Sequence, residues 1–524
     1  MSAPEPQDVA QQRRMLQALV AGLERSRAEG PASWIETHIS HVILHGEFAY
    51  KIKKPLDLGF LDFSTLERRR FYCGEELRLN RRLAPGLYLD RVAITGSPQR
   101  PRLQGPGAAI EYAVRMRRFD QEALLSVHPP DRATIAEIAQ RVAGFHREIE
   151  VAGPNSPHGT PQRVVEPMLE NFVQIRATGV VETAQARLQR LEEWTRAQAG
   201  QLAPLLECRH REGHIRECHG DMHLGNITRY RGRLEIFDGI EFNPELRWID
   251  TLNEIAFLVM DLQQRGLEGL AWGLLNDYLE LTGDYEGVAL LRFYQLYRAM
   301  VRAKVTAIRL AQADLPEDEG SALSEQFNGY LTLAERYTRA VAPVLLITHG
   351  LSGSGKSLYS GWLAERLPAI RLRSDVERQR LFSPAEGPGG AIGEGIYTPQ
   401  ATQATYGRLR TLAGGLLRAG YSVICDATFL KEGQRRWFRE LADELGLPCI
   451  ILDLQAPVPL LRERVSTRLR QGGDASEAGL EVLEMQLASR QSLGPAERAQ
   501  ALTIESRESP GEKLLDRLRQ RLAG

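Results

Sequence analysis

The stretch Val344-Leu-Leu-Ile-Thr-His-Gly-Leu-Ser-Gly-Ser-Gly-Lys-Ser357 decides the fold of the last third of this 524-residue chain. Its apolar start predicts a β-strand over 344–348, and a helix is expected from Lys356 onward. The loop between them fits the phosphate-loop pattern G-x-x-x-x-G-K-[ST] without a mismatch. Such a loop turns backbone N–H groups toward phosphate oxygens, so the stretch predicts a nucleotide-binding site.

Each position of this loop has an expected task. Lys356 meets the charge of the β- and γ-phosphates, and the Ser357 hydroxyl can ligate Mg²⁺. The chain contains only seven lysines, which makes a lysine at this position more informative. The loop residues expected to bind nucleotide are Gly350, Ser352, Gly353, Ser354, Gly355, Lys356 and Ser357.

Length and composition describe an ordinary globular protein of two or three domains, with 43% hydrophobic and 25% charged residues. The net charge of −1 lacks the basic excess that nonspecific binding to nucleic acid or membrane surfaces requires. The five cysteines show no metal-ligand spacing and are typical of a reducing cytoplasm. No apolar run reaches the roughly 18 residues of a membrane span, so no membrane partner is expected.

The order of expected elements divides the chain at the glycine loop. Residues 1–340 are predicted to form one α+β domain, with a strand-rich lobe over about 30–118 and a helical lobe over about 119–340. Residues 341–524 alternate strand and helix, which predicts an α/β domain with a parallel sheet. No long low-complexity linker separates the halves, so they are expected to pack together.

A second dense motif lies upstream, at His219-Gly-Asp-Met-His-Leu-Gly-Asn226, followed by Phe237-Asp-Gly239. Phosphoryl transfer needs a base for the attacking hydroxyl, a metal on the phosphates and positive charge on the triphosphate. The spacing from Asp221 to Asn226 is that of the protein-kinase catalytic loop, with the aspartate as base and the asparagine on the metal. Asp238 then stands where a second metal carboxylate is needed. His223 is interpreted as a hydrogen-bonded loop residue.

The lysine of this upstream site is less well determined by the sequence. Lys51 in Ala49-Tyr-Lys51 fits the strand that supplies a kinase its phosphate lysine, but Lys53 shares its face of the strand. Either Glu75 or Glu76 on the next expected helix could pair with the chosen lysine. No G-x-G-x-x-G precedes Lys51, so the flap over the phosphates must differ from that of a protein kinase.

Residues 30–310 resemble the aminoglycoside phosphotransferase and choline kinase branch of the protein-kinase-like fold, on the motif from His219 to Asn226. The resemblance implies a bilobal domain with ATP and Mg²⁺ as cofactors. It also implies roles for the residues: Asp221 as catalytic base, Lys51 as catalytic phosphate lysine, Asn226 and Asp238 as metal ligands, and Lys53, Glu76 and His219 beside the nucleotide.

Downstream of the glycine loop, three features favour a small-molecule kinase. Asp426 is followed by Ala427-Thr428, whereas motor ATPases usually place a catalytic Glu directly after this aspartate. Asp375, at the end of a strand expected beside the loop, could act as base, while Asp426 steadies Mg²⁺. Four arginines precede a Gly-Gly-Asp loop and suggest a mobile lid; Arg468 is our catalytic candidate, and Arg462, Arg464 and Arg470 stay open.

Residues 343–505 resemble the P-loop kinase group that contains polynucleotide kinase, gluconate kinase and zeta-toxin-type kinases, often labelled AAA family ATPases. The residues that carry this resemblance are Gly350 to Ser357, Ser374-Asp375, Asp426-Ala-Thr428 with Arg435 or Arg436, and the Asp474-Ala-Ser476 loop. The order of the two domains resembles bacterial fusions of a phosphotransferase-like domain with a P-loop kinase.

Both halves therefore indicate transfer of the ATP γ-phosphate to a hydroxyl acceptor such as a sugar, nucleotide sugar or nucleoside. Nucleic acid is not expected as a partner, although a polynucleotide 5′-hydroxyl stays open for the C-terminal half. An aminoglycoside acceptor would need an acidic pocket, for which Glu241, Asp250, Glu254 and Asp261 are candidates. The alternative is that one half is a nucleotide-binding module that regulates or restrains the other, or that the P-loop half is an ATPase switch.

Overall fold

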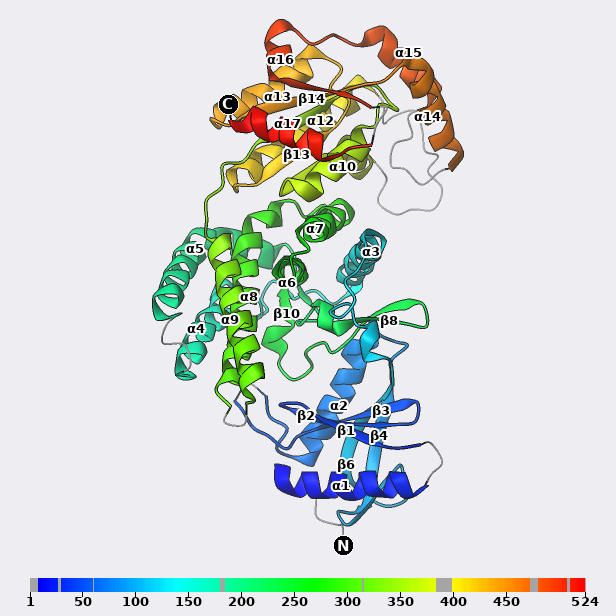
Figure 1. Ribbon diagram of the computed structural model, residues 1–524, viewed down its shortest axis with the longest axis vertical. Coiled ribbons are helices and arrows are strands. Elements are labelled where there is room, and N and C mark those ends of the chain that lie inside the picture. Colours follow the sequence, from blue (N-terminus) through cyan, green and yellow to red (C-terminus); the bar gives the residue numbers. More distant parts are fainter. Residues whose placement is uncertain are drawn as a thin grey trace. The chain divides into compact units, whose positions relative to one another are not determined.

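The computed structural model of the chain describes residues 8–26, 30–59, 61–179, 184–312, 315–382, 398–471, 479–506 and 509–523 (Figure 1). The sequence also predicts a glycine-rich loop at 385–395; this loop and the Asp474–Ser476 loop lie outside the described residues. The chain forms two compact units. The N-terminal unit comprises residues 1–264 and 293–335, and the P-loop unit comprises residues 265–292 and 336–524.

The first lobe of the N-terminal unit is a six-stranded antiparallel sheet in the order β1-β2-β3-β6-β4-β5. Its elements are α1 (Val9–Ser26), β1 (Ser33–Glu36), β2 (Ser40–His45), β3 (Phe48–Lys53), α2 (Leu66–Asn80), β4 (Tyr88–Ser97), β5 (Arg100–Leu103) and β6 (Ala109–Arg117). The two edge strands β1 and β5 were not expected from the sequence. Both are four residues long, and neither shows a strong apolar alternation.

Alternating side chains of the sheet pack against one helix on each face. Tyr50 and Ile52 of β3 lie in a buried cluster with Met15 and Leu19 of α1. Ala49, on the other face, lies in a cluster with Cys73 and Leu77 of α2. Because β3 alternates faces, Lys51 and Lys53 lie on the α2 side, which places them over the second lobe's loops.

The second lobe is mainly helical and carries two small antiparallel hairpin-like pairs, β10-β7 and β8-β9. Its elements are α3 (Arg132–Glu148), α4 (Pro161–Ala177), α5 (Gln185–Arg211), β7 (Ile215–Glu217), β8 (Ile227–Tyr230), β9 (Arg233–Ile236), β10 (Trp248–Asp250), α6 (Thr251–Gln264), α8 (Leu291–Leu310) and α9 (Glu317–Tyr337). Nearly every residue of α6 is buried, so this helix forms the centre of the lobe. The bilobal α+β fold expected for this part of the chain is confirmed.

The P-loop unit contains a five-stranded parallel sheet in the order β12-β13-β11-β14-β15. Its strands are β11 (Leu345–His349), β12 (Ala369–Arg373), β13 (Ser422–Asp426), β14 (Cys449–Gln455) and β15 (Ala501–Glu505). Helices α10 (Lys356–Arg366) and α17 (Glu512–Ala523) pack on one face of this sheet. The remaining helices are α11 (Ser374–Phe382), α12 (Pro399–Arg418), α13 (Glu432–Glu444), α14 (Val458–Gln471), α15 (Leu480–Ser489) and α16 (Pro495–Gln500).

The parallel α/β fold is confirmed, but one expected neighbour is wrong. The strand before Asp375, β12, was expected beside the P-loop strand β11. β13 lies between them and pairs with both. The sequence order of strands does not reveal this insertion, because a later strand can enter the sheet between two earlier ones through a crossover connection.

The division into two units differs from a boundary at 340/341 in residues 336–340 and in one longer segment, 265–292. Helix α7 (Glu268–Thr282) and the 3₁₀ turn η5 (Glu286–Leu290) belong to the P-loop unit. Trp272 of α7 lies 6.4 Å from Tyr421 between ring centroids, and Arg292 donates a 2.8 Å hydrogen bond to Gly420 O. This segment therefore forms part of the P-loop unit, although it precedes the phosphate loop by more than 50 residues.

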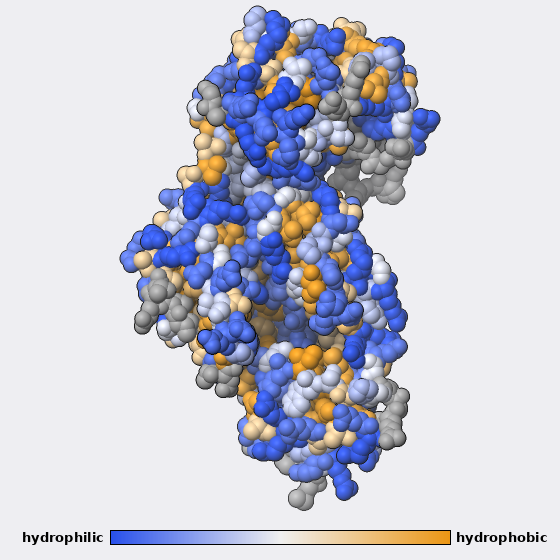
Figure 2. Space-filling view, in the orientation of Figure 1, coloured by the Kyte–Doolittle hydropathy of each residue, from blue (hydrophilic) through white to orange (hydrophobic). Residues whose placement is uncertain are grey.

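Hydrophilic residues cover most of the face seen in Figure 2, with smaller hydrophobic patches between them. Among the described helices, none combines the length and apolar character that crossing a membrane requires.

Arg435, one of the residues that carry the resemblance to P-loop kinases, has a structural task. It is fully buried, and its Nε lies 2.7 Å from Glu497 Oε1. It also donates to Phe429 O at 3.0 Å. Arg436, by contrast, has a side chain that is 66% exposed.

We expect Arg435→Ala to lower the free energy of unfolding of the P-loop unit by about 3–5 kcal/mol, because Glu497 would remain buried without its cation. The matched control is Arg436→Ala, which should change it by no more than about 0.5 kcal/mol. Urea denaturation of the full chain measures both. Equal effects of the two substitutions would contradict the structural role of Arg435.

Candidate active sites

Two lysines and one glutamate form the base of the N-terminal site. Lys51 Nζ lies 2.9 Å from Glu76 Oε1, and Lys53 Nζ lies 2.7 Å from Glu76 Oε2. Lys53 is fully buried and also contacts Glu241, whereas Lys51 retains 15% of its side-chain exposure. Glu75 instead pairs with Arg78 on its own helix at 2.8 Å. The structure thus brings Glu76, not Glu75, to the lysines and places Lys51 nearer to solvent.

This cluster remains charged. Burial opposes ionisation of Glu76, but Lys51 and Lys53 lower its pKa to about 2. Burial likewise opposes the charge on Lys51, yet Asp238 and Glu76 raise its pKa well above the usual range. The Lys51 ammonium is therefore protonated at any physiological pH and presents fixed positive charge.

Helices α6 and α8 form hydrogen bonds with the loop between β7 and β8. Gly220 N donates to Glu254 Oε1 at 2.6 Å, and Leu224 N donates to Asp261 Oδ2 at 3.0 Å. Gly220 has a φ of +87°, and a Cβ there would lie 2.7 Å from Leu246 O. Only glycine fits this approach, so the backbone before Asp221 is fixed.

Asp221 and Asn226 lie together on this loop. Asn226 Nδ2 donates to Asp221 O at 3.0 Å and to Asp221 Oδ2 at 3.2 Å. His223 Nε2 lies 3.6 Å from the same carboxylate oxygen. Burial opposes ionisation of Asp221, but His223 and Arg302 lower its pKa below the usual range, so the carboxylate is ionised. His223 Nδ1 accepts from Gly225 N at 3.1 Å, as a loop residue does.

His219 braces the two loops of the site. Its Nδ1 accepts from Asp221 N at 3.3 Å, and its Nε2 lies 2.9 Å from Phe237 O. An acceptor at Nδ1 leaves the proton on Nε2, which then donates to the carbonyl. Burial lowers the pKa of His219, which keeps the ring neutral. His219 therefore positions Asp221 and the segment that ends in Asp238.

Asp238 follows β9 in a left-handed backbone conformation, with a φ of +64°. Its N–H donates to the Tyr88 hydroxyl at 3.2 Å, and Gly239 N donates to Asn80 Oδ1 at 2.7 Å. The Asp238 carboxylate lies 2.5 Å from Lys51 Nζ and is 46% exposed. Phe237 N donates to Asn226 O at 2.9 Å, so the hairpin of β8 and β9 returns Asp238 to the loop that carries Asn226.

A cleft of about 910 Å³ opens beside Lys51 and Asp238. Val42, Leu44, Ala49 and Met116 line it with apolar surface suited to a purine ring. The turn between β1 and β2, at Thr37, contains no glycine, and Lys54 Nζ donates to Thr37 O at 2.5 Å. Lys54 thus holds this glycine-free turn in place.

The four acidic residues considered for an aminoglycoside pocket are all buried and engaged within the lobes. Asp250, for example, binds Arg209 at 2.6 Å and accepts from the Tyr294 hydroxyl at 3.1 Å. Glu254 binds His146 at 2.9 Å. These buried carboxylates bind groups within the protein and therefore do not form an acidic acceptor pocket. The four residues are Glu241, Asp250, Glu254 and Asp261.

The phosphate loop of the second site has the geometry that its glycines predict. Gly353 and Gly355 have φ values of +82° and +86°, and a Cβ on Gly353 would lie 2.8 Å from Leu461 O. Lys356 Nζ donates to Leu351 O at 2.8 Å across the loop. Ser352 N donates to the side chain of Gln486 at 2.8 Å, which ties α15 to the loop.

A pocket of about 430 Å³ brings Lys356, Ser357, Asp375, Asp426 and Arg468 together. Asp426 ends β13 and accepts from the Ser360 hydroxyl at 2.9 Å. Asp375 lies in the first turn of α11 and not at the end of a strand, and Arg378 stands 3.5 Å from its carboxylate. Burial lowers the pKa of Lys356, while Asp426 and Asp375 oppose this effect.

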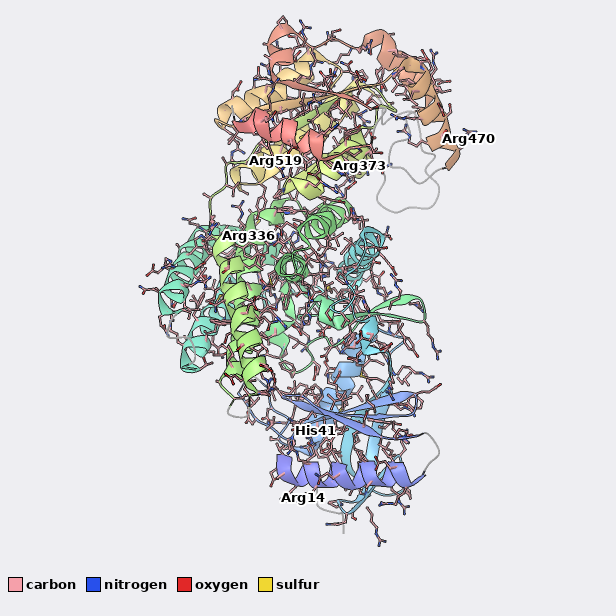
Figure 3. All side chains as sticks on the ribbon, viewed as in Figure 1. Arg14, His41, Arg336, Arg373, Arg470 and Arg519 are labelled. Atoms are coloured by element: carbon pink, nitrogen blue, oxygen red, sulfur yellow. The ribbon has the colours of Figure 1, made fainter. Side chains whose placement is uncertain are left out.

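The four arginines of α14 have separate partners. Arg464 and Arg468 line the pocket, and Arg464 also donates to Gly353 O at 3.3 Å. Arg462 forms an exposed pair with Glu484 at 2.8 Å. Arg470, near the end of α14 in Figure 3, bonds Thr467 at 3.3 Å and is exposed. The structure thus brings the candidate Arg468 to the pocket.

Several described pocket residues were missed by sequence reasoning. Arg378 follows Asp375 by one helical turn, and Arg373 precedes it at the end of β12, so their positions could have been inferred from the helix and strand periods. The others come from distant helices and carried no signal in the sequence: Tyr406, Lys431, Gln434 and Gln486.

Part of the P-loop unit matches a known family model. Residues 345–493 match the family model described as an AAA domain, AAA_33. The chain is 30% identical over 447 residues to the uncharacterized protein Rv2004c of Mycobacterium tuberculosis and to Mb2027c of Mycobacterium bovis, which covers 84% of this chain and 87% of each relative.

Similar solved structures fall into two groups. A choline/ethanolamine kinase family protein from Mesorhizobium loti is 12% identical with a TM-score of 0.38, over 62% of this chain and 98% of that one. A sugar kinase from Janibacter sp. is 23% identical with a TM-score of 0.27, over 35% of this chain and 95% of that one. The predicted fusion of a phosphotransferase-like domain with a P-loop kinase-like domain is confirmed.

The two lysines of the N-terminal site should respond differently to substitution. Lys53→Met leaves Glu241 buried without its cation and should lower the free energy of unfolding by about 3–5 kcal/mol. Lys51→Met keeps the Lys53–Glu76 pair and should change stability less, but it should weaken ATP binding at this site. Urea denaturation and calorimetric ATP titration of each variant separate the roles. The roles of Lys51 and Lys53 are the reverse of those expected if Lys53→Met weakens ATP binding without destabilising the unit.

Proposed function

The chain belongs to the same family as the mycobacterial protein Rv2004c, and from its own site geometry we propose that it is a bifunctional, ATP-dependent phosphotransferase. Each unit transfers the γ-phosphate of ATP to a hydroxyl group of a small acceptor molecule. One observation carries the proposal: each unit has a candidate base, a candidate metal carboxylate and a phosphate lysine at one site.

The same bonds form and break in both units. The acceptor oxygen forms a bond to the γ-phosphorus while the bond from that phosphorus to the β–γ bridging oxygen breaks. The electron pair of the broken bond leaves with ADP, and the hydroxyl proton passes to a carboxylate. Phosphoryl transfer is loose, with charge spread over the equatorial oxygens, so positioning and positive charge contribute most of the catalysis.

In the N-terminal unit, Asp221 receives the proton and Lys51 contacts the phosphates. The lowered pKa of Asp221 means that its carboxylate is ionised before the acceptor arrives. A weak base suffices, because in a loose transition state the proton moves late. Asn226, through its side-chain amide, holds Asp221 in place. The apolar part of the cleft takes the purine, which directs the triphosphate toward Lys51.

In the P-loop unit, the loop N–H groups and Lys356 hold the β- and γ-phosphates, and Asp375 receives the acceptor proton. Asp375 and Lys356 line the same pocket, as a base and a γ-phosphate ligand must. Arg468 adds guanidinium charge from the lid.

The residues present fit a magnesium ion in both units, because they offer hard oxygen ligands. Asn226 and the half-exposed Asp238 carboxylate would hold it upstream, and Ser357 with Asp426 would hold it downstream. When bound, Mg²⁺ neutralises charge on the phosphate oxygens.

The central test uses one base substitution per unit in the full chain. Loss of a positioned base typically lowers a rate by about 10²–10⁴-fold. Asp221→Asn should therefore silence transfer to one acceptor and leave transfer to the other nearly intact, and Asp375→Asn should do the converse. Transfer from γ-labelled ATP to pooled metabolites measures both. If either substitution abolishes all transfer, the two units form one enzyme with a dependent partner.

Nucleotide stoichiometry provides a separate test. Calorimetric titration of ATP with Mg²⁺ into the full chain should reveal two sites, and Lys356→Ala should remove one of them. Asp375→Asn should retain both sites, because its role is in turnover rather than in binding. A single site in the unsubstituted chain, or unchanged binding in Lys356→Ala, would refute the proposed phosphate role of this loop.

A further inference from the structure

Helix α7 closes the outer edge of the P-loop unit's sheet. β12 is an edge strand, and Asn276 of α7 pairs with its backbone. Asn276 Nδ2 donates to Ala369 O at 3.0 Å, and Asn276 Oδ1 accepts from Arg371 N at 2.7 Å. Asn276 is buried, so these bonds satisfy backbone groups that an edge strand would otherwise leave open.

One turn further along α7, Glu280 binds two arginines of the same strand. Its Oε2 accepts from Arg371 Nη2 at 2.7 Å, and its Oε1 accepts from Arg373 Nη1 at 2.8 Å. Only 13% of the Glu280 side chain is exposed. Burial opposes ionisation, but the two arginines lower the pKa of Glu280, so the carboxylate stays charged.

Both arginines lie close to the phosphate loop. Arg371 Nη1 donates to Ser357 O at 3.3 Å, in the first turn of the helix that follows the loop. Arg373, labelled in Figure 3, lines the pocket together with Lys356 and Asp375. Arg373 precedes Asp375 by two residues, and a base must lie beside the oxygen that attacks the γ-phosphorus.

We propose that Glu280 is a positioning residue of the P-loop site, which holds the Arg373 guanidinium toward the phosphoryl group in transfer. The proposal rests on the proposed function of the P-loop unit. Ordering an arginine side chain costs it rotamer freedom. Glu280 orders Arg373 before the reaction, so its charge is available where charge develops in the transition state. Part of the P-loop site is therefore built from residues that lie in the first domain's stretch of sequence.

The test compares ADP with ADP plus aluminium fluoride, which mimics the planar phosphoryl group in transfer. Both are titrated with Mg²⁺ into the full chain, and the P-loop site is the one lost in Lys356→Ala. Glu280→Gln should leave the ADP dissociation constant within about twofold and weaken ADP–aluminium fluoride by about tenfold or more. Glu268→Gln, on the same helix in an exposed pair with Arg336 at 3.2 Å, is the matched control and should change neither.

Arg373→Met should produce the same selective loss, and adding Glu280→Gln to it should cause little further loss, because Glu280 acts on the phosphoryl group through the Arg373 guanidinium. Equal weakening of ADP and ADP–aluminium fluoride would make Glu280 structural only and overturn the inference. Additive losses, or no loss in Glu280→Gln, would overturn it as well. If the unsubstituted chain binds no ADP at the Lys356 site, the proposed function of the P-loop unit is contradicted. The inference, which rests on that function, is then contradicted as well.

Discussion

The buried carboxylate of Glu76 is the interaction on which the N-terminal site depends. Two ammonium groups on one face of β3 would repel each other, yet each oxygen of Glu76 lies within ion-pair distance of one of them. The second lysine is balanced by Glu241, which follows Asp238 by three residues. Ion pairs therefore join strand β3, helix α2 and the loop that carries Asp238. Removing one of the charged groups leaves its partner as an unpaired ion inside the lobe.

The P-loop unit contains the same arrangement of one carboxylate between two cations. There a single carboxylate, Glu280, holds two guanidinium groups of β12. In both units one carboxylate that is largely shielded from solvent pairs with two cations, and one cation of each pair lines a cleft or pocket. Phosphate recognition needs positive charge that is in place before the ligand arrives, and ion pairs of this kind supply it.

Sequence reasoning identified the phosphate loop, Asp221, Asn226 and Asp238 because their spacing along the chain is fixed by one local turn or hairpin. It placed the strand before Asp375 beside the P-loop strand, which is wrong, because β13 enters between them from later in the sequence. It left Lys51 and Lys53 open, since strand alternation puts both on one face. Only the three-dimensional partners Glu76, Asp238 and Glu241 separate the two lysines.

Helix α7 shows why a boundary drawn from sequence can divide a site. The predicted cut at 340/341 follows the change from helical pattern to P-loop strand, which is the strongest signal in that region. However, Asn276 and Glu280 contact β12 through side chains, and such contacts leave no periodic trace in the sequence. A fragment that begins at 341 would lack both residues and expose the backbone of an edge strand to solvent. The P-loop unit is complete only with residues 265–292, so its chemistry belongs to the full chain.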